Sequence, residues 1–249
     1  MKLSVAILAK NEAANLPEAL ESVKWADEII VGVDATSTDE TEAIAKESGC
    51  KVLTVDLSKG FATAKNQLID AAKMNWILVL DADERVTAKL RDEIVHTIET
   101  TTESGFWVPC HNNLLGRFMD HGGWYPDKKL RLVMNGRARY IDREIHEDMQ
   151  VEGSVGSLIN PLQHYTHRTI KEILRRIDQY SDLDAKIIVG VLPKRIRART
   201  LLRPALREFW RRYIKLRGYK DGIVGFIEAA LQGVYVFVGY VKAWELRKK

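Results

Sequence analysis

Two aspartates one residue apart, Asp81 and Asp83, end an apolar run in the segment ILVLDADERV, residues 77–86. Buried carboxylates are costly unless they are paired or hydrogen-bonded, so a cation is one reason to place them at the tip of a strand. Carboxylate oxygens select Mg²⁺ or Mn²⁺ among the biological metals. Mg²⁺ is usually held by one or two carboxylates together with substrate phosphates. The pair therefore predicts a divalent cation that binds a nucleoside diphosphate group.

Further acidic residues follow other apolar runs. Glu12 comes after residues 3–9, and Asp34 ends the run at 27–34. Ligands of parallel sheets bind at the carboxyl ends of the strands, so we expect these two side chains to converge with Asp81 and Asp83. Four carboxylates in one cleft repel one another unless a metal, a base or a sugar hydroxyl takes up their lone pairs. The alternative is that Asp34 and Asp83 only cap helices.

The elements that must position these residues follow an alternating pattern. Four short, β-branched apolar runs are typical of strands buried on both faces: LSVAILA, DEIIVGVD, KVLTVD and NWILVLD. Helical segments with cap residues separate them, which predicts a parallel sheet with right-handed crossovers. After residue 102 the pattern changes to mixed or antiparallel strands, with Asn135-Gly136 as a hairpin signal, and from Thr169 it is helical again.

Length and composition predict one folded catalytic domain with an appendage. The chain has 249 residues, 46% of them hydrophobic, and its two cysteines, Cys50 and Cys110, have no spacing typical of a disulfide framework or zinc site. The first apolar run is too short for an export signal, so we expect a reducing, cytoplasmic compartment. We expect a catalytic domain at 1–190, with a nucleotide-binding half at 1–102 and an acceptor half at 103–190, and an extension at 191–249.

Several segments resemble a known family in order and spacing: LSVAILAKNEAANLPEAL, VDATSTDETEAIA, GFATAKNQLIDAA, WILVLDADERV, GGWYPDKKLRLVMNG, IHEDM and QHYTHRTIKEILRRIDQYS. They are similar to the family 2 glycosyltransferases with a GT-A fold, and most of all to the small bacterial branch that includes lipopolysaccharide core glycosyltransferases. The resemblance covers nearly the whole chain. It implies an α/β GT-A fold, an activated-sugar donor and inversion at the anomeric carbon.

The resemblance also implies roles for individual residues in the first half. Asp34 matches the carboxylate that accepts from the base, usually uracil, and Glu12 matches an acidic residue near the nucleoside. Asp81 and Asp83 match the DxD motif, in which the first aspartate faces the ribose and the second binds the divalent ion, Mg²⁺ or Mn²⁺. Lys65 matches a position near the nucleotide, although it could equally lie on a solvated helix face.

Inversion by direct displacement requires a base within reach of the acceptor hydroxyl. The segment REIHEDM supplies candidates, and the resemblance favours Glu147 as the base with His146 beside the acceptor. Asp148 is the alternative, because neighbouring residues of a strand point to opposite faces and only one of the two can serve. His164 matches a C-terminal histidine that adds a metal contact, or it is an ordinary loop histidine. Trp124 could stack on an acceptor sugar or anchor a core.

The C-terminal segment has a strong positive charge. Residues 185–249 contain 16 Lys and Arg against 4 Asp and Glu, whereas the rest contains 22 against 30. Basic, aromatic and aliphatic residues alternate in residues 193–222, as in a helix on a membrane surface. Residues 222–244 could just span a bilayer, but we favour a helix in or against the anionic inner leaflet. The alternative is a helical pair that packs on the catalytic domain or forms a dimer interface.

The function that we expect is an inverting, metal-dependent, nonprocessive transfer of a hexose from a nucleotide-sugar to a lipid-linked saccharide. The Gln-x-x-Arg-Trp motif of processive members of the family is absent. The enzyme would act at the cytoplasmic face of the membrane. A polyprenyl-phosphate glycosyltransferase is the main alternative. A sugar nucleotidyltransferase should have a Gly-rich loop after the first strand, where this chain has AKNEAANL. Nucleic acid is not an expected partner, since the basic segment is too rich in apolar residues for phosphate binding alone.

Overall fold

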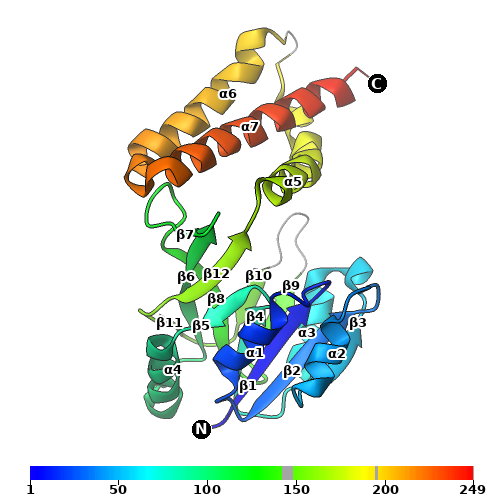
Figure 1. Ribbon diagram of the computed structural model, residues 1–249, viewed down its shortest axis with the longest axis vertical. Coiled ribbons are helices and arrows are strands. Elements are labelled where there is room, and N and C mark those ends of the chain that lie inside the picture. Colours follow the sequence, from blue (N-terminus) through cyan, green and yellow to red (C-terminus); the bar gives the residue numbers. More distant parts are fainter. Residues whose placement is uncertain (142–147, 194–195, 249) are drawn as a thin grey trace. The chain divides into compact units, whose positions relative to one another are not determined.

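The chain divides into two compact units in this computed structural model, which describes residues 1–141, 148–193 and 196–248 (Figure 1). The first unit contains Met1–Cys110 and Lys128–His164, and the second contains His111–Asp127 and Tyr165–Lys249. The helix Ile170–Val191, which spans the predicted boundary at 190, falls in the second unit, where it packs against the helix Gly222–Leu246.

A parallel sheet forms the first half of the first unit. Its strands are β1 (Leu3–Ala9), β2 (Glu28–Asp34), β3 (Lys51–Val55) and β4 (Trp76–Asp81), in the order β3-β2-β1-β4. β1 pairs in parallel with both β2 and β4, with Ala9 opposite Val33 and Leu8 opposite Asp81. The predicted parallel arrangement is therefore confirmed, and the carboxyl ends of β1, β2 and β4 lie at one edge.

Helices on the sheet bury one face each. They are α1 (Leu16–Val23), α2 (Thr41–Glu47), α3 (Phe61–Ala71) and α4 (Ala88–Thr100). In α1 the buried residues are Leu16, Ala19, Leu20 and Val23, the spacing of a single helical stripe. Asn15 stands at the N-cap position of α1, but its side chain accepts no hydrogen bond from the helix, and its amide nitrogen donates to Glu12 instead.

The remaining strands are mixed, as predicted. They are β5 (Glu84–Val86), β6 (Gly105–Leu114), β7 (Arg117–Phe118), β8 (Asp127–Met134), β9 (Ala138–Ile141), β10 (Asp148–Val151), β11 (Val155–Ser157) and β12 (Leu162–His167). The sheet continues from β4 in the order β8-β6-β12-β5, with β8 antiparallel to β4. Asn135 and Gly136 form a turn, with Gly136 at φ +80. The hairpin prediction is wrong, because β9 leaves the large sheet and pairs with β10.

The second unit is mainly helical. It contains α5 (Ile170–Val191), α6 (Ala198–Trp210) and α7 (Gly222–Leu246), with a π-helical segment at Arg211–Lys215 and a 3-10 turn at Gly218–Asp221. α7 packs against both α5 and α6. A Cβ at Gly233 would lie 3.2 Å from the carbonyl oxygen of Ala205, so the backbones of α6 and α7 approach closely there. Gly218–Leu246 is long and apolar enough to cross a membrane.

Candidate active site

The strand ends bring four predicted residues to one edge of the first unit. Asp34 ends β2 and Asp81 ends β4, on either side of β1, with Glu12 shortly after β1 and Asp83 just beyond β4. Neighbouring strands are about 4.8 Å apart, so strands β2 and β4 are separated by roughly 10 Å. That spacing suits a ligand with a nucleoside at one end and a diphosphate at the other.

Asp34 is almost completely buried, at 3% exposed. The backbone N–H of Thr36 donates to its Oδ1 at 2.8 Å, the Thr36 hydroxyl donates to the same oxygen, and the N–H of Leu57 donates to Oδ2 at 2.9 Å. The Nζ of Lys10 lies 3.4 Å from Oδ1. The Thr36 hydroxyl, opposed by burial and helped by the Leu57 amide, lowers the pKa of Asp34 to about 2. Asp34 is therefore ionised and fixes the loop after β2.

Asp81 belongs to a buried network of charges. Nη2 of Arg131, on β8, lies 2.6 Å from Oδ2 of Asp81 and 2.6 Å from Oε1 of Glu84. The backbone N–H of Asp81 donates to the second oxygen of Glu84 at 3.0 Å. The Nζ of Lys65 lies 3.3 Å from Oδ1 of Asp81, and that of Lys129 lies 3.6 Å from Glu84. Glu84 is 0% exposed and Arg131 is 3% exposed.

The charges of this network shift the pKa values of Asp81 and Arg131 in opposite directions. Burial alone would raise the pKa of Asp81, but the charges of Arg131, Lys65 and Lys129 hold it well below its ordinary range. Burial likewise opposes the charge of Arg131, and Asp81 and Glu84 raise the pKa of Arg131 well above its ordinary value. Asp81 and Asp34 are thus neutralised by the protein itself. Cations of the protein therefore relieve the repulsion that the sequence analysis attributed to a metal, a base or a sugar hydroxyl.

Asp83 has different surroundings. Its carboxylate faces His164, whose Nε2 lies 3.4 Å from Oδ2 of Asp83. The two residues meet because β5 pairs antiparallel with β12, which places His164 opposite Glu84, the neighbour of Asp83. Both side chains retain some exposure, at 15% for Asp83 and 13% for His164.

Asp83 and His164 could contribute two ligands to a divalent cation. Within residues 1–141, 148–193 and 196–248, three or more His, Cys, Asp or Glu side chains do not gather in a cluster suited to a metal. A two-residue site fits Mg²⁺ or Mn²⁺ only when phosphate and water oxygens complete the coordination shell. The chemistry of the donor set therefore fits a metal that arrives with a phosphorylated ligand.

Two other predicted residues lie in the first unit. Glu12 is half-buried, and its carboxylate accepts from the Asn15 amide at 2.6 Å. Lys65 is 4% exposed and its Nζ lies 5.2 Å from the centre of the Tyr140 ring. The alternative of a solvated helix face is therefore wrong for Lys65. Its ammonium group is directed at Asp81.

The structure describes only some of the residues predicted to act as the base or to contact the acceptor. Glu147 and His146 lie outside the described residues. Asp148 begins β10, opposite Ile141 of β9. Trp124 belongs to the second unit, where it is half-buried and the guanidinium carbon of Arg212 lies 5.2 Å from its ring centre.

Sequence reasoning missed Arg131, Glu84 and Lys129. Each stands in a strand, and a charged residue is rarely buried unless it is paired. Lys129 and Arg131 are two residues apart in KKLRLV, which places them on one face of β8. This alternation was the available signal, and it gave no indication of the partner strand.

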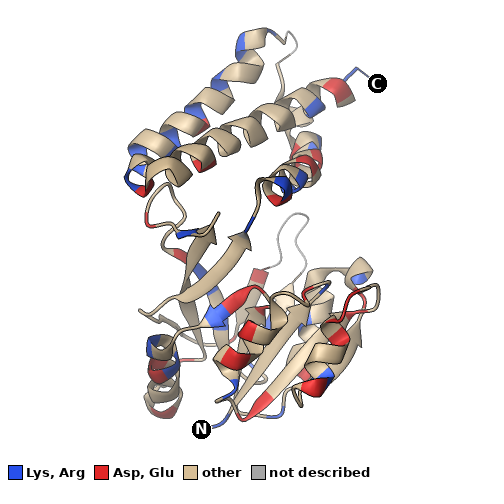
Figure 2. Ribbon diagram, viewed as in Figure 1, with Lys and Arg blue, Asp and Glu red and all other residues tan. Residues whose placement is uncertain are grey.

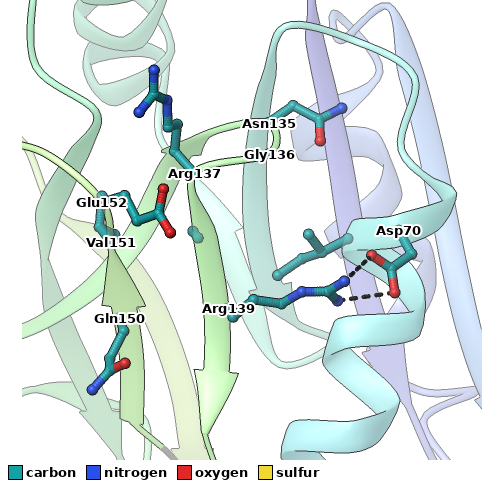
Figure 3. Close-up of a pocket in the computed structure, with 10 residues that line it drawn as sticks. Asp70, Asn135, Gly136, Arg137, Arg139, Gln150, Val151 and Glu152 are labelled. Atoms are coloured by element: carbon teal, nitrogen blue, oxygen red, sulfur yellow. Dashed lines mark hydrogen bonds and ion pairs between the residues drawn. The ribbon is translucent and has the colours of Figure 1, made fainter.

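A pocket of about 650 Å³ also opens in the first unit, away from these residues. Figure 3 shows Asp70 of α3 paired with Arg139 of β9 beside the turn at Asn135 and Gly136. That turn follows Met134, which pairs with Trp76 at the start of β4, whereas Asp81 is at the end of β4. The pocket therefore lies toward the opposite edge of the sheet, and we assign it no part in the chemistry.

Comparisons with known proteins agree with this arrangement. Residues 4–146 match the family described as Glycosyl transferase family 2. The chain is 28% identical over 258 residues to the lipopolysaccharide core biosynthesis glycosyltransferase LpsC of Rhizobium meliloti (strain 1021), covering 98% of this chain and 93% of LpsC. It is also 28% identical to an uncharacterized glycosyltransferase of Rickettsia bellii (strain RML369-C), covering 99% of this chain and 86% of that protein.

Solved structures show the same fold at low identity. The mannosyltransferase PcManGT from Pyrobaculum calidifontis, in complex with GDP-Man and Mn²⁺, aligns with a TM-score of 0.53 at 12% identity, over 98% of this chain and 87% of that one. S. aureus TarS 1–349 in complex with UDP-GlcNAc aligns with a TM-score of 0.51 at 13% identity, over 100% and 92%. The parallel half-sheet, the DxD residues at its edge and the match over residues 4–146 lead to one conclusion: the chain is a glycosyltransferase of family 2 with the GT-A fold.

Proposed function

We propose that this glycosyltransferase transfers a hexose, with inversion and one residue at a time, from a UDP-sugar to a lipid-linked saccharide such as the core of lipopolysaccharide. The observation that supports the proposal best is that the two aspartates of the DxD pair have different contacts. Asp81 is bound by Arg131 and Lys65, whereas Asp83 faces His164 and keeps capacity for a ligand.

Asp83 and His164 would hold Mg²⁺ or Mn²⁺ together with the donor's diphosphate. When bound, the cation would neutralise the negative charge that develops on the leaving group. Two structural neighbours support a nucleotide-sugar donor, since PcManGT was crystallised with GDP-Man and Mn²⁺ and TarS with UDP-GlcNAc.

Other residues of the first unit would bind and orient the nucleoside. Asp81, fixed by two cationic side chains, would face the ribose without the entropy cost of ordering a free carboxylate. Glu12 would lie near the nucleoside. Asp34 would accept from the base, and because three hydrogen bonds already reach it, it would also hold the surrounding loop in shape.

The base and the residues that contact the acceptor are proposed from the sequence. Glu147 would take the proton of the acceptor hydroxyl as that oxygen attacks the anomeric carbon, with Asp148 as the alternative base. His146 and Trp124 would contact the acceptor.

The proposed acceptor is lipid-linked, so the enzyme would act at the cytoplasmic face of the membrane. Similarity to LpsC, which is named for lipopolysaccharide core biosynthesis, supports this class of acceptor. The basic and apolar residues after position 190 support attachment to an anionic inner leaflet.

A panel of UDP- and GDP-sugars tests the donor and the metal together. Released nucleoside diphosphate would be measured with Mn²⁺, with Mg²⁺ and with a chelator. We expect metal-dependent hydrolysis of one donor, and a loss of at least about 100-fold in Asp83→Asn, with the exposed Asp92→Asn as the matched control. Wild-type turnover by Asp83→Asn, or turnover unaffected by the chelator, would contradict the proposal.

A further inference from the structure

Helix α6 and the π-helical segment after it display two parallel rows of side chains at four-residue spacing. One row is basic and contains Arg199, Arg203, Arg207, Arg211 and Lys215. The other is apolar, and its members are exposed as follows: Leu202 47%, Leu206 65%, Trp210 55% and Ile214 37%. Residues four apart are neighbours on a helix surface, so each row is continuous and the two lie side by side. Figure 2 shows the Lys and Arg positions recurring along α6.

Neither row is used to pack the helical unit. The buried residue of α6 is Ala205, whose backbone faces Gly233 of α7, and Phe209 of the same face packs edge-on to Phe226. α7 directs two charged side chains into the unit: Glu228 is 1% exposed, and Lys242 lies 2.7 Å from a carboxylate oxygen of Asp178 on α5. α7 packs against both α5 and α6, and it exposes apolar side chains such as Ile223 and Val234 without a basic row beside them, whereas α6 presents both rows outward.

The basic row also has few partners within the protein. In the part of the chain that the structure describes, Arg199, Arg203 and Arg207 form no ion pair with a carboxylate. Glu208, the acidic residue of α6, is bound by Arg211 at 2.6 Å and by Arg212 at 2.7 Å. Three neighbouring guanidinium groups thus remain available to an anionic partner.

The combination of the two rows selects one class of partner. A nucleic acid would use the basic row but would leave Leu206 and Trp210 in water, because phosphate contacts need no aliphatic surface. A second copy of this chain would cover the apolar row but would oppose its arginines with the like charges of the same surface. A bilayer with anionic headgroups meets both rows at once: the apolar row enters the acyl boundary while the arginines remain among the phosphates.

We propose that the outward face of α6, formed by these two rows, is the surface by which the enzyme docks on an anionic phospholipid bilayer. The inference rests on the proposed function and adds a specific surface to the membrane location proposed from composition. It assigns the contact to α6, within the basic segment 193–222 that the sequence predicts to lie on a membrane surface, and not to residues 222–244. An apolar row of four residues beside three free arginines gives reversible, salt-sensitive attachment.

Flotation of the full-length protein with vesicles tests the proposal. The vesicles contain phosphatidylcholine alone or with phosphatidylglycerol. We expect binding only to the anionic vesicles and release at high salt. Removing three charges in R199Q/R203Q/R207Q should weaken binding on the order of 100-fold, from about fivefold per basic residue near an anionic surface. Removing the apolar row in L206S/W210S should weaken it by at least about tenfold.

Matched variants of the first unit control for charge and for apolarity. K2Q/K73Q/K89Q removes three exposed lysines, and Ile159→Ser removes an apolar side chain that is 81% exposed. Both should float like the wild type. The proposal is overturned if the wild type does not bind anionic vesicles, if the two α6 variants bind as well as the controls, or if the rows prove to mediate dimerisation or DNA binding instead.

The donor reaction separates this inference from the proposed function. Metal-dependent hydrolysis of the sugar nucleotide in the absence of vesicles should be unchanged in both α6 variants, which also shows that they are folded. A wild type that floats but has no such hydrolysis would refute the proposed function alone, and an active wild type that does not float would refute this inference alone.

Discussion

Replacement of Arg131 by methionine tests whether the protein itself neutralises the first aspartate of the DxD pair. Methionine retains much of the volume of the side chain and removes the guanidinium group that bridges Asp81 and Glu84 at 2.6 Å. Two carboxylates would then share a site in which Glu84 is fully buried. Each would keep one more distant lysine, Lys65 at 3.3 Å and Lys129 at 3.6 Å.

The expected loss follows from these contacts. Removing one member of a buried ion pair costs about 3–5 kcal/mol, because an uncompensated charge is left behind. The two lysines remain, so we expect the lower end, about 3 kcal/mol in the free energy of unfolding. For a protein of this size that corresponds to a decrease in Tm of roughly 6–12 °C.

Urea denaturation followed by circular dichroism measures the loss. Arg139→Met is the matched control, because Arg139 and its partner Asp70 are both more than half exposed and such pairs contribute about 1 kcal/mol or less. The double variant E84Q/R131M should be more stable than Arg131→Met alone, since it removes the charge left unpaired. A loss below about 1 kcal/mol for Arg131→Met, or no recovery in the double variant, would refute this account of the network.

Three further predictions concern the site. Glu147→Gln should abolish sugar transfer and preserve nucleotide binding measured by calorimetry, and wild-type turnover would show that another residue is the base. His164→Ala should weaken Mn²⁺ binding in the presence of UDP by at least about tenfold, measured by titration calorimetry, with His96→Ala on α4 as the control. Asp34 has a pKa of about 2 in the folded protein, below its ordinary value of 3.8, so its ionised form stabilises the fold above about pH 4 and this contribution is lost as the pH falls toward 2. The stability difference between wild type and Asp34→Asn should therefore be constant near neutral pH and shrink on acidification in urea titrations; a difference that grows toward pH 2 would contradict the hydrogen bonding described for Asp34.

The parallel half of the fold could be predicted because its signals are local. Continuous apolar runs define β1, β2 and β4, and helices between them leave parallel pairing as the simple solution. The convergence of Asp34, Asp81 and Asp83 follows from that topology. The turn at Asn135 and Gly136 was also local and is present.

Features that depend on distant partners could not be predicted in the same way. The Asn135-Gly136 signal specifies a turn but not which strands pair, and β9 pairs with β10 instead of β8. Arg131 is recognisable as a charged residue between Leu130 and Leu132, yet the neighbouring sequence does not indicate that Asp81 and Glu84 are its partners. α5 belongs to the second unit because it packs against α7. That helix begins at Gly222, 31 residues after α5 ends at Val191.

Loss of Asp81 and loss of Asp83 should have different consequences in a cell. Asp81 balances the buried charges of Arg131 and Lys65, so its replacement should lower the stability and the abundance of the enzyme as well as any contact with the donor. Among the described residues Asp83 contacts neither of these cations, so its replacement should leave the abundance of the protein unchanged and, under the proposed function, would remove a metal ligand. Measuring the amount of folded protein together with activity would therefore distinguish the two positions of the motif.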